Sequence, residues 1–163
     1  MNLTKNPMAL NKHKLEILWA CGDSELLEVD MIRWANAAMD EVAEVPSEVS
    51  LKVVSIDEMT ALNSEYRGKL GATNVLSFPL NVVGDADFLI LGDLAICLEV
   101  VKAEARDQGK SMSAHFAHLL VHGVLHLAGY DHEDDEDARE MEAKETQILA
   151  AVDISAPYEI GIK

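Results

Sequence analysis

The stretch HGVLHLAGYDH, residues 122–132, carries three histidines within eleven positions. A helix would place His122 and His126 on one face, one turn apart, because they are four residues apart. If that helix continued, His132 would point about 120° away from His126. Gly129 lies between them, and glycine readily adopts the left-handed conformation that ends helices. The spacing therefore predicts a helix that ends near Gly129 and a turn that brings His132 back beside the other two histidines.

Three histidines in this arrangement predict a metal site, with one Zn²⁺ ion held by His122, His126 and His132. Three protein ligands leave a fourth position for water, which is typical of a catalytic zinc ion. Structural zinc sites are more often closed by cysteines, and neither cysteine, Cys21 or Cys97, is near this segment. A catalytic site is therefore the main prediction, and a structural ion is the alternative.

The spacing H-x-x-x-H-x-x-G-x-x-H is that of the metzincin peptidases, in which a glutamate after the first histidine acts as general base. In this chain that position is Gly123, which carries no ionisable group, so peptide hydrolysis is disfavoured. Asp131 and Glu133 flank His132 and are the nearest candidate bases, although either could instead support a ligand or be an exposed acid. Of the two, Asp131 is the predicted catalytic residue. Gly123 itself predicts the close approach of a substrate or a crossing strand, since glycine within a helix costs about 1 kcal/mol relative to alanine.

Two further histidines, His118 and His115, lie one and two turns before His122 on the same helical face. They predict either packing or a polar helix surface, or else contacts that support a metal ligand or the substrate. In the second case, His118 is the residue expected to contact the substrate. The acidic segment 133–137 predicts a helix start that matches the helix dipole, with a second metal site as the alternative.

The hydrophobic pattern predicts an α+β domain with one small mixed sheet of about four strands packed against helices. The metal site would lie on a helix and the following turn, as in zincin-like proteins. Pro79 favours a sheet edge or a strand end because proline cannot donate to the ladder, and 81–87 is expected to be a loop. Alternating or continuous apolar residues predict strands at 15–19, 49–53, 74–80 and 88–100, the last interrupted at Gly92 and Asp93. Apolar residues at helical spacing, with turn and capping residues, predict helices at 29–42, 57–66, 112–128 and 133–152. A further helix is expected to follow the last strand and to end near residue 108.

The chain of 163 residues suits a single domain, 1–163, with a hydrophobic core. Thirteen basic and 29 acidic residues give a net charge of −16, which argues against a positively charged coat for non-specific nucleic-acid binding. A small cationic patch is still compatible with this charge. The two cysteines form no paired motif, residues 1–14 contain no continuous apolar run, and no stretch is long enough to span a membrane. These features predict a protein of the reducing cytoplasm without a secretory signal.

Four segments resemble the YbeY family of bacterial endoribonucleases, which mature ribosomal RNA. HGVLHLAGYDH is similar to the family's signature, and GKSMSAHFAHLLV (109–121) is similar to the helix before it. LNSEYRGKLGATNVLSFP (62–79) and GDLAI (92–96) resemble two earlier blocks, in the family's order. The chain departs from the family at Asn74, where an aspartate is usual.

The resemblance implies that the three histidines bind one zinc ion, and it matches Arg67 to a family arginine thought important for activity. The residues themselves agree, because Arg67 and Lys69 form a cationic spot in a glycine-containing loop of an acidic chain. A guanidinium can hold a phosphate through two parallel hydrogen bonds and stabilise charge as a bond breaks. Arg67 is therefore predicted to be catalytic and, with Lys69, to bind the substrate.

The leading hypothesis is a zinc-dependent endoribonuclease that acts on single-stranded RNA, chiefly precursors of ribosomal RNA, in ribosome maturation and quality control. The acidic charge then requires a local groove, a basic partner such as a ribosomal protein, or both. One alternative is another metallohydrolase, such as a peptidase. The other is a ribosome-assembly factor with a mainly structural metal.

Overall fold

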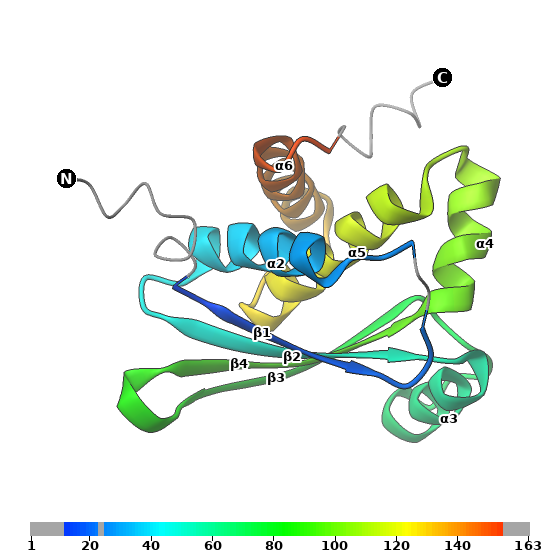
Figure 1. The fold of residues 1–163 in the computed structure, drawn as a ribbon, viewed down its shortest axis with the longest axis horizontal. Helices are drawn as coiled ribbons and strands as arrows, with labels where there is room; N and C mark the ends of the chain where they lie inside the picture. Colours follow the sequence, from blue (N-terminus) through cyan, green and yellow to red (C-terminus); the bar gives the residue numbers. More distant parts are fainter. Residues whose placement is uncertain (1–11, 23–24, 155–163) are drawn as a thin grey trace.

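Four strands form one mixed sheet in the order β1-β2-β4-β3 (Figure 1). The computed structural model describes residues 12–22 and 25–154, so most of the segment expected to carry no secretory signal lies outside the described residues. Strands β1, β2 and β4 are parallel, and β3 runs antiparallel to β4 at the edge of the sheet. The strands are Lys14–Trp19 (β1), Ser47–Val54 (β2), Val75–Val83 (β3) and Leu89–Cys97 (β4). The predicted α+β class with a small mixed sheet is confirmed.

Helices cover mainly one face of this sheet (Figure 1). Helices α2, α5 and α6 lie over that face, and α3 lies against the other face at one end of the strands. In the described part of the chain, no helix is long and apolar enough to cross a membrane. The α-helices are Glu28–Val42 (α2), Ile56–Arg67 (α3), Leu98–Gln108 (α4), Met112–Leu127 (α5) and Asp135–Ala151 (α6), and a short 3₁₀ helix is Asp85–Asp87 (η2).

The main core lies between the sheet and helices α2, α5 and α6. Val49, Leu51 and Val53 of β2 alternate along the strand, and each is at most 1% exposed. They belong to the same apolar cluster as Leu120 and Val124 of α5. Full burial of such a side chain stabilises the fold by about 1.5–3 kcal/mol. Helix α5 is therefore held firmly, which makes it a rigid support for the histidines it carries.

The opposite face of the sheet is only partly covered. A smaller apolar cluster joins Met59 of α3 to Leu76 of β3 and Ala95 of β4. Further along the same face, Leu18 of β1 is 59% exposed. Helix α3 thus shields one end of this face and leaves the remainder open to solvent.

Strand β3 is longer than the sequence pattern predicts. Residues 81–87 were expected to form a loop, but β3 continues to Val83 after an irregularity between Pro79 and Val82. Asn81 adopts a φ of 52° there, and its side-chain Nδ2 donates to the carbonyl of Leu127 at 3.1 Å. The register shift lets β3 continue past Pro79, which cannot donate a ladder hydrogen bond. The hydrogen bond from Asn81 connects β3 to the end of α5. The expected edge position of Pro79 is confirmed.

Strand β4 is also continuous where an interruption was expected. Gly92 has a φ of 151°, and the register with β2 shifts at this position. A Cβ atom on Gly92 would collide with the carbonyl oxygen of Phe78 in the neighbouring strand. The glycine therefore permits a bulge within the strand, which bends β4 without ending it.

A buried histidine joins the start of β1 to β2 and α2. The ring Nδ1 of His13 accepts a hydrogen bond from the backbone N–H of Ser47 at 3.0 Å, and Nε2 lies 3.1 Å from Oδ1 of Asp40. Burial lowers the pKa of His13, although Asp40 acts in the opposite direction. The folded protein therefore favours the neutral form of this ring more strongly than the unfolded chain does.

This burial predicts a loss of stability on acidification. The unfolded chain takes up a proton near the ordinary histidine pKa of about 6.5, whereas folded His13 resists it. The stabilisation by neutral His13 is thus present above that pH and is lost as the pH falls below it. We expect the urea midpoint to decrease more steeply from about pH 7.5 to about pH 5.5 in the wild type than in His13→Gln. Parallel decreases in the two proteins would contradict this assignment.

Candidate metal centre

The turn after α5 brings the three histidines together. Gly129 adopts a φ of 105°, and its N–H donates to the carbonyl of His126 at 3.0 Å. The chain then turns back, and the ring centroid of His132 lies 5.6 Å from that of His122 and 5.1 Å from that of His126. The predicted helix end near Gly129 and the return of His132 are both confirmed.

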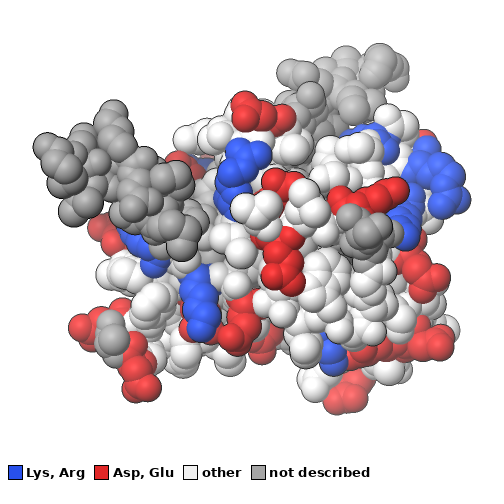
Figure 2. All heavy atoms as spheres, viewed as in Figure 1, with Lys and Arg blue, Asp and Glu red and all other residues white. Residues whose placement is uncertain are grey.

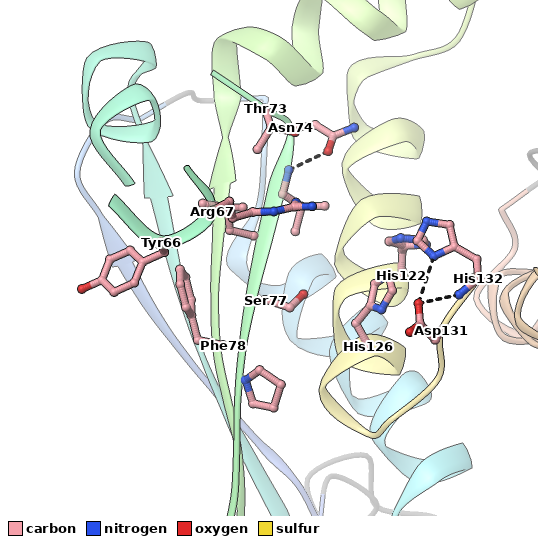
Figure 3. A pocket seen from close by; sticks show the side chains of 13 residues that line it. Tyr66, Arg67, Thr73, Asn74, Ser77, Phe78, His122, His126, Asp131 and His132 are labelled. Carbon is pink, nitrogen blue, oxygen red and sulfur yellow. Dashed lines mark hydrogen bonds and ion pairs between the residues drawn. The ribbon is translucent and has the colours of Figure 1, made fainter. Parts of the chain in front are cut away.

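The three side chains fit a single metal ion. One ligand atom from each of His122, His126 and His132 lies within 4.8 Å of the other two (Figure 3). With Zn–N distances of about 2.0–2.1 Å, tetrahedral nitrogens lie about 3.3 Å apart, so small side-chain movements would complete the geometry. Burial lowers the pKa of His126, and the neighbouring His122 and His132 lower it further. A lowered pKa keeps the ring neutral, which is the form that binds a metal.

Contacts on the other ring nitrogen orient two of these histidines. Nδ1 of His126 lies 3.0 Å from the carbonyl oxygen of Tyr130 and can donate to it. Nδ1 of His122 contacts Oε2 of Glu145 in the same way. Both rings therefore present Nε2 to the centre of the cluster, as metal-ligating histidines usually do.

Glu145 of α6 is the residue that sequence reasoning missed. Its side chain is fully buried, and its second oxygen, Oε1, lies 3.1 Å from Nε2 of His118. A carboxylate in this position fixes the tautomer of His122 and raises the basicity of the ligating nitrogen. The available signal was a charged residue on the otherwise apolar inward face of α6, between Met141 and Ile148. Such a residue is seldom buried without partners.

His118, His122 and Glu145 also lie close enough to hold an ion. However, both carboxylate oxygens of Glu145 already contact these two histidines, and the carboxylate is fully buried. His118 and Glu145 are absent from the lining of the cleft described below, whereas His126 and His132 are part of it. The His122, His126 and His132 set is therefore the one that a substrate can reach. His118 lies behind His122, where it can support a ligand, and its predicted contact with substrate stays a prediction.

The three histidines open into a cleft of about 580 Å³, which we call the histidine cleft. One wall is α5 with its following turn, and the other is the edge strand β3 with the end of α3 (Figure 3). Its lining is Tyr66, Arg67, residues 73–79, His122, His126, Asp131 and His132.

Two of the predicted catalytic residues line this cleft. Arg67, the last residue of α3, is exposed, and its side chain extends towards α5 (Figure 3). Asp131 accepts a hydrogen bond from the backbone N–H of His132 at 2.7 Å, and its Oδ1 lies 3.6 Å from Nδ1 of that ring. Asp131 can thus orient His132 or take a proton in the cleft. Lys69 is exposed in the loop after α3 and is not among the lining residues.

Gly123 allows α5 to approach the sheet. A Cβ atom at this position would lie 2.8 Å from Cδ2 of Leu94, a buried residue of β4. Of the two predicted reasons for this glycine, the crossing strand is the one that the structure shows. The glycine that replaces the peptidase glutamate therefore has a packing role.

Asn74 stands where the resembled family usually has an aspartate, and its side-chain amide contacts the carboxylate of Glu104. Its Nδ2 donates to Oε1 and Oε2 of Glu104 at 3.1 and 3.3 Å. Glu104 also lies 2.8 Å from Nε2 of His115, whose pKa is lowered by burial. An amide beside Glu104 avoids the repulsion that two carboxylates would create. His115 thus takes part in this partly buried contact and lies outside the lining of the cleft.

Comparison with known proteins shows the family of this chain. The family model described as "Endoribonuclease YbeY" matches residues 21–153, which include Arg67 and all three clustered histidines. The solution structure of TM1509 from Thermotoga maritima is similar, with a TM-score of 0.61 and 31% sequence identity over 85% of this chain and 88% of that chain. Since the family match covers most of the sequence, the chain belongs to the endoribonuclease YbeY family.

Proposed function

We propose that this chain is a zinc-dependent endoribonuclease that hydrolyses phosphodiester bonds in single-stranded RNA, chiefly precursors of ribosomal RNA, in the cytoplasm. The observation that carries the proposal is the meeting of three convergent histidines and Arg67 in one cleft. Membership of an endoribonuclease family supports the reaction class. A role in ribosome quality control extends the same proposal, because it requires the same cleavage of ribosomal RNA.

The residues of the cleft suit phosphodiester cleavage. When bound, Zn²⁺ would polarise a phosphoryl oxygen and acidify a water molecule. Arg67 would hold two phosphate oxygens through parallel N–H donors and stabilise negative charge as it develops. Asp131, with a side chain 48% exposed in the cleft, would accept the proton of the attacking water. Glu145 would hold the ring of His122 in place throughout.

The charge of the surface limits how RNA binds. Acidic and basic side chains are interspersed on the face in Figure 2, which shows no continuous basic patch. A net charge of −16 would repel an extended RNA backbone, so affinity must come from the cleft and from contacts specific to it. We therefore include the ribosome in the proposal, with basic ribosomal proteins as partners that offset this repulsion.

A combined metal and cleavage assay tests the proposed function. The purified chain should contain one zinc ion per molecule and cut a single-stranded ribosomal RNA precursor, while leaving the same sequence intact in a duplex. Chelation should abolish cleavage, and added Zn²⁺ should restore it. Cleavage of a peptide but not RNA would favour the metallohydrolase alternative. Binding to pre-ribosomal particles without any cleavage, and unaffected by Arg67→Ala, would favour an assembly factor.

A further inference from the structure

A second hollow adjoins the histidine cleft on the opposite face of the sheet. It has a volume of about 550 Å³ and lies between α3 and outward side chains of all four strands. We call it the outer hollow. Tyr66 and Phe78 line both the outer hollow and the histidine cleft, so the two cavities meet at this aromatic pair.

The aromatic pair forms a supported platform. The two rings contact edge to face, with centroids 5.2 Å apart and planes at 74°. Phe78 is partly buried against the smaller apolar cluster, whereas Tyr66 is 59% exposed. Figure 3 shows both rings on the side of β3 away from the histidines, and Ser77 on the side towards them. A supported, exposed ring is suited to stacking a nucleobase, which is how many proteins hold single-stranded nucleic acids.

The edge of β3 leaves a path between the two cavities. Within the described residues, no strand pairs with the outer side of β3. The carbonyl of Asn74 accepts from the N–H of Cys97 at 2.9 Å, which sets the alternation of hydrogen-bonded pairs with β4. By that alternation, the backbone groups of Val75 and Ser77 point away from β4. The N–H of Val75 already donates to Oδ1 of Asn74, so the outward groups left for a ligand are the carbonyl of Val75 and both backbone groups of Ser77. A single strand of RNA can therefore cross this edge and find hydrogen-bonding groups on the way.

The charges of the two cavities differ. Arg67 lies opposite Asp131 and the three histidines in the histidine cleft, whereas the outer hollow holds three carboxylates, those of Glu16, Glu58 and Asp93. Lys52, the lysine of the outer hollow, is already paired with Glu58. Carboxylates repel phosphate groups but accept hydrogen bonds from the amino groups of bases. The cleft thus favours phosphate, and the outer hollow favours a base.

We propose that the outer hollow binds an unpaired base of the substrate strand, stacked on Tyr66, while a nearby phosphodiester lies at the three histidines. This inference rests on the proposed function and adds the feature that selects single-stranded RNA. In a duplex each base is paired and stacked, and both contacts must be broken before a base can enter the outer hollow. Tyr66 is then a specificity-determining residue.

Kinetics of Tyr66 variants test the stacking. Tyr66→Ala should raise the KM for single-stranded RNA by about tenfold or more and leave kcat unchanged, because a stacked base contributes equally to ground-state and transition-state binding. Tyr66→Phe keeps the ring and should restore most of the affinity. Tm should fall by only a few degrees in Tyr66→Ala, since Tyr66 is exposed near the end of α3 and loses only its ring contact with Phe78.

Substrates that lack one base give the sharper measurement. An abasic nucleotide is placed at successive positions around the cleaved bond, and KM is measured for the wild type and Tyr66→Ala. At one position, removal of the base should raise the wild-type KM about tenfold and have no further effect in Tyr66→Ala. The base site is overturned if the abasic nucleotide raises KM by the same factor in Tyr66→Ala as in the wild type at every position, or if Tyr66→Ala leaves KM unchanged. Either result leaves the proposed function intact. If Tyr66→Ala changes the oligomeric mass of the protein but not its KM, the hollow is a contact between copies of the chain. A wild type that cuts no RNA overturns both proposals.

Discussion

His126→Ala should remove the bound metal and lower RNA cleavage by about a thousandfold or more, since the ion supplies several kcal/mol of transition-state stabilisation. His126 is one of the three proposed ligands, and two imidazoles hold zinc much more weakly than three. Its Nδ1 contact with Tyr130 is local to the turn, so the sheet and the other helices should stay folded. Elemental analysis, Tm and cleavage of a ribosomal RNA precursor would be measured on the same preparation.

The matched control for this variant is His115→Gln. His115 lies on the same helix and is more deeply buried than the half-buried His126, and it contacts Glu104 and does not line the cleft. Its replacement should keep the metal and most of the activity. Full zinc occupancy in the doubly substituted His122→Ala/His126→Ala protein would show that the metal binds elsewhere.

Arg67→Ala should reduce cleavage about a hundredfold, equivalent to about 3 kcal/mol, while metal content and Tm stay at wild-type values. The side chain is exposed at the end of α3, so its removal leaves no core cavity, and its proposed contact is with the phosphate. Lysine should restore activity only in part, because an ammonium group cannot form two parallel hydrogen bonds in a fixed plane.

Lys69→Ala gives the comparison that separates position from charge. It removes the same charge two positions further on, in the loop after α3, but lies outside the lining of the cleft, so its effect should be much smaller and should weaken with added salt. Equal losses in Lys69→Ala and Arg67→Ala would indicate a general electrostatic effect. If Arg67→Ala lowers Tm in proportion to its loss of activity, Arg67 has a structural role instead.

Features set by neighbouring residues could be predicted from the sequence. The face shared by His122 and His126 follows from helical periodicity, and the return of His132 follows from the glycine at 129. The edge position of Pro79 follows from its missing N–H. Each of these depends on a few consecutive residues, so periodicity and turn chemistry suffice to place them.

Features that depend on distant partners could not be predicted. Glu145 is an acid on a helix that begins with acids, and only the packing of α6 against α5 shows that it contacts His122. The extension of β3 depends on an Asn81 side chain that reaches the end of α5. Tyr66 and Phe78 are twelve positions apart and come from different elements, so their contact follows only from how α3 lies on the sheet.

The order in which the parts of the site leave the ribosome has a consequence for the cell. Arg67 and the wall formed by β3 precede the whole of α5 in the chain, whereas the three ligands and Glu145 come after all four strands. A nascent chain that has emerged only as far as α4 therefore contains Arg67 but none of the clustered histidines. Such a chain would hold no zinc and would be unable to cut the RNA on which it is being made. Under the proposed function, late synthesis of the three histidines would delay nuclease activity until α5, the turn after it and α6 have been made.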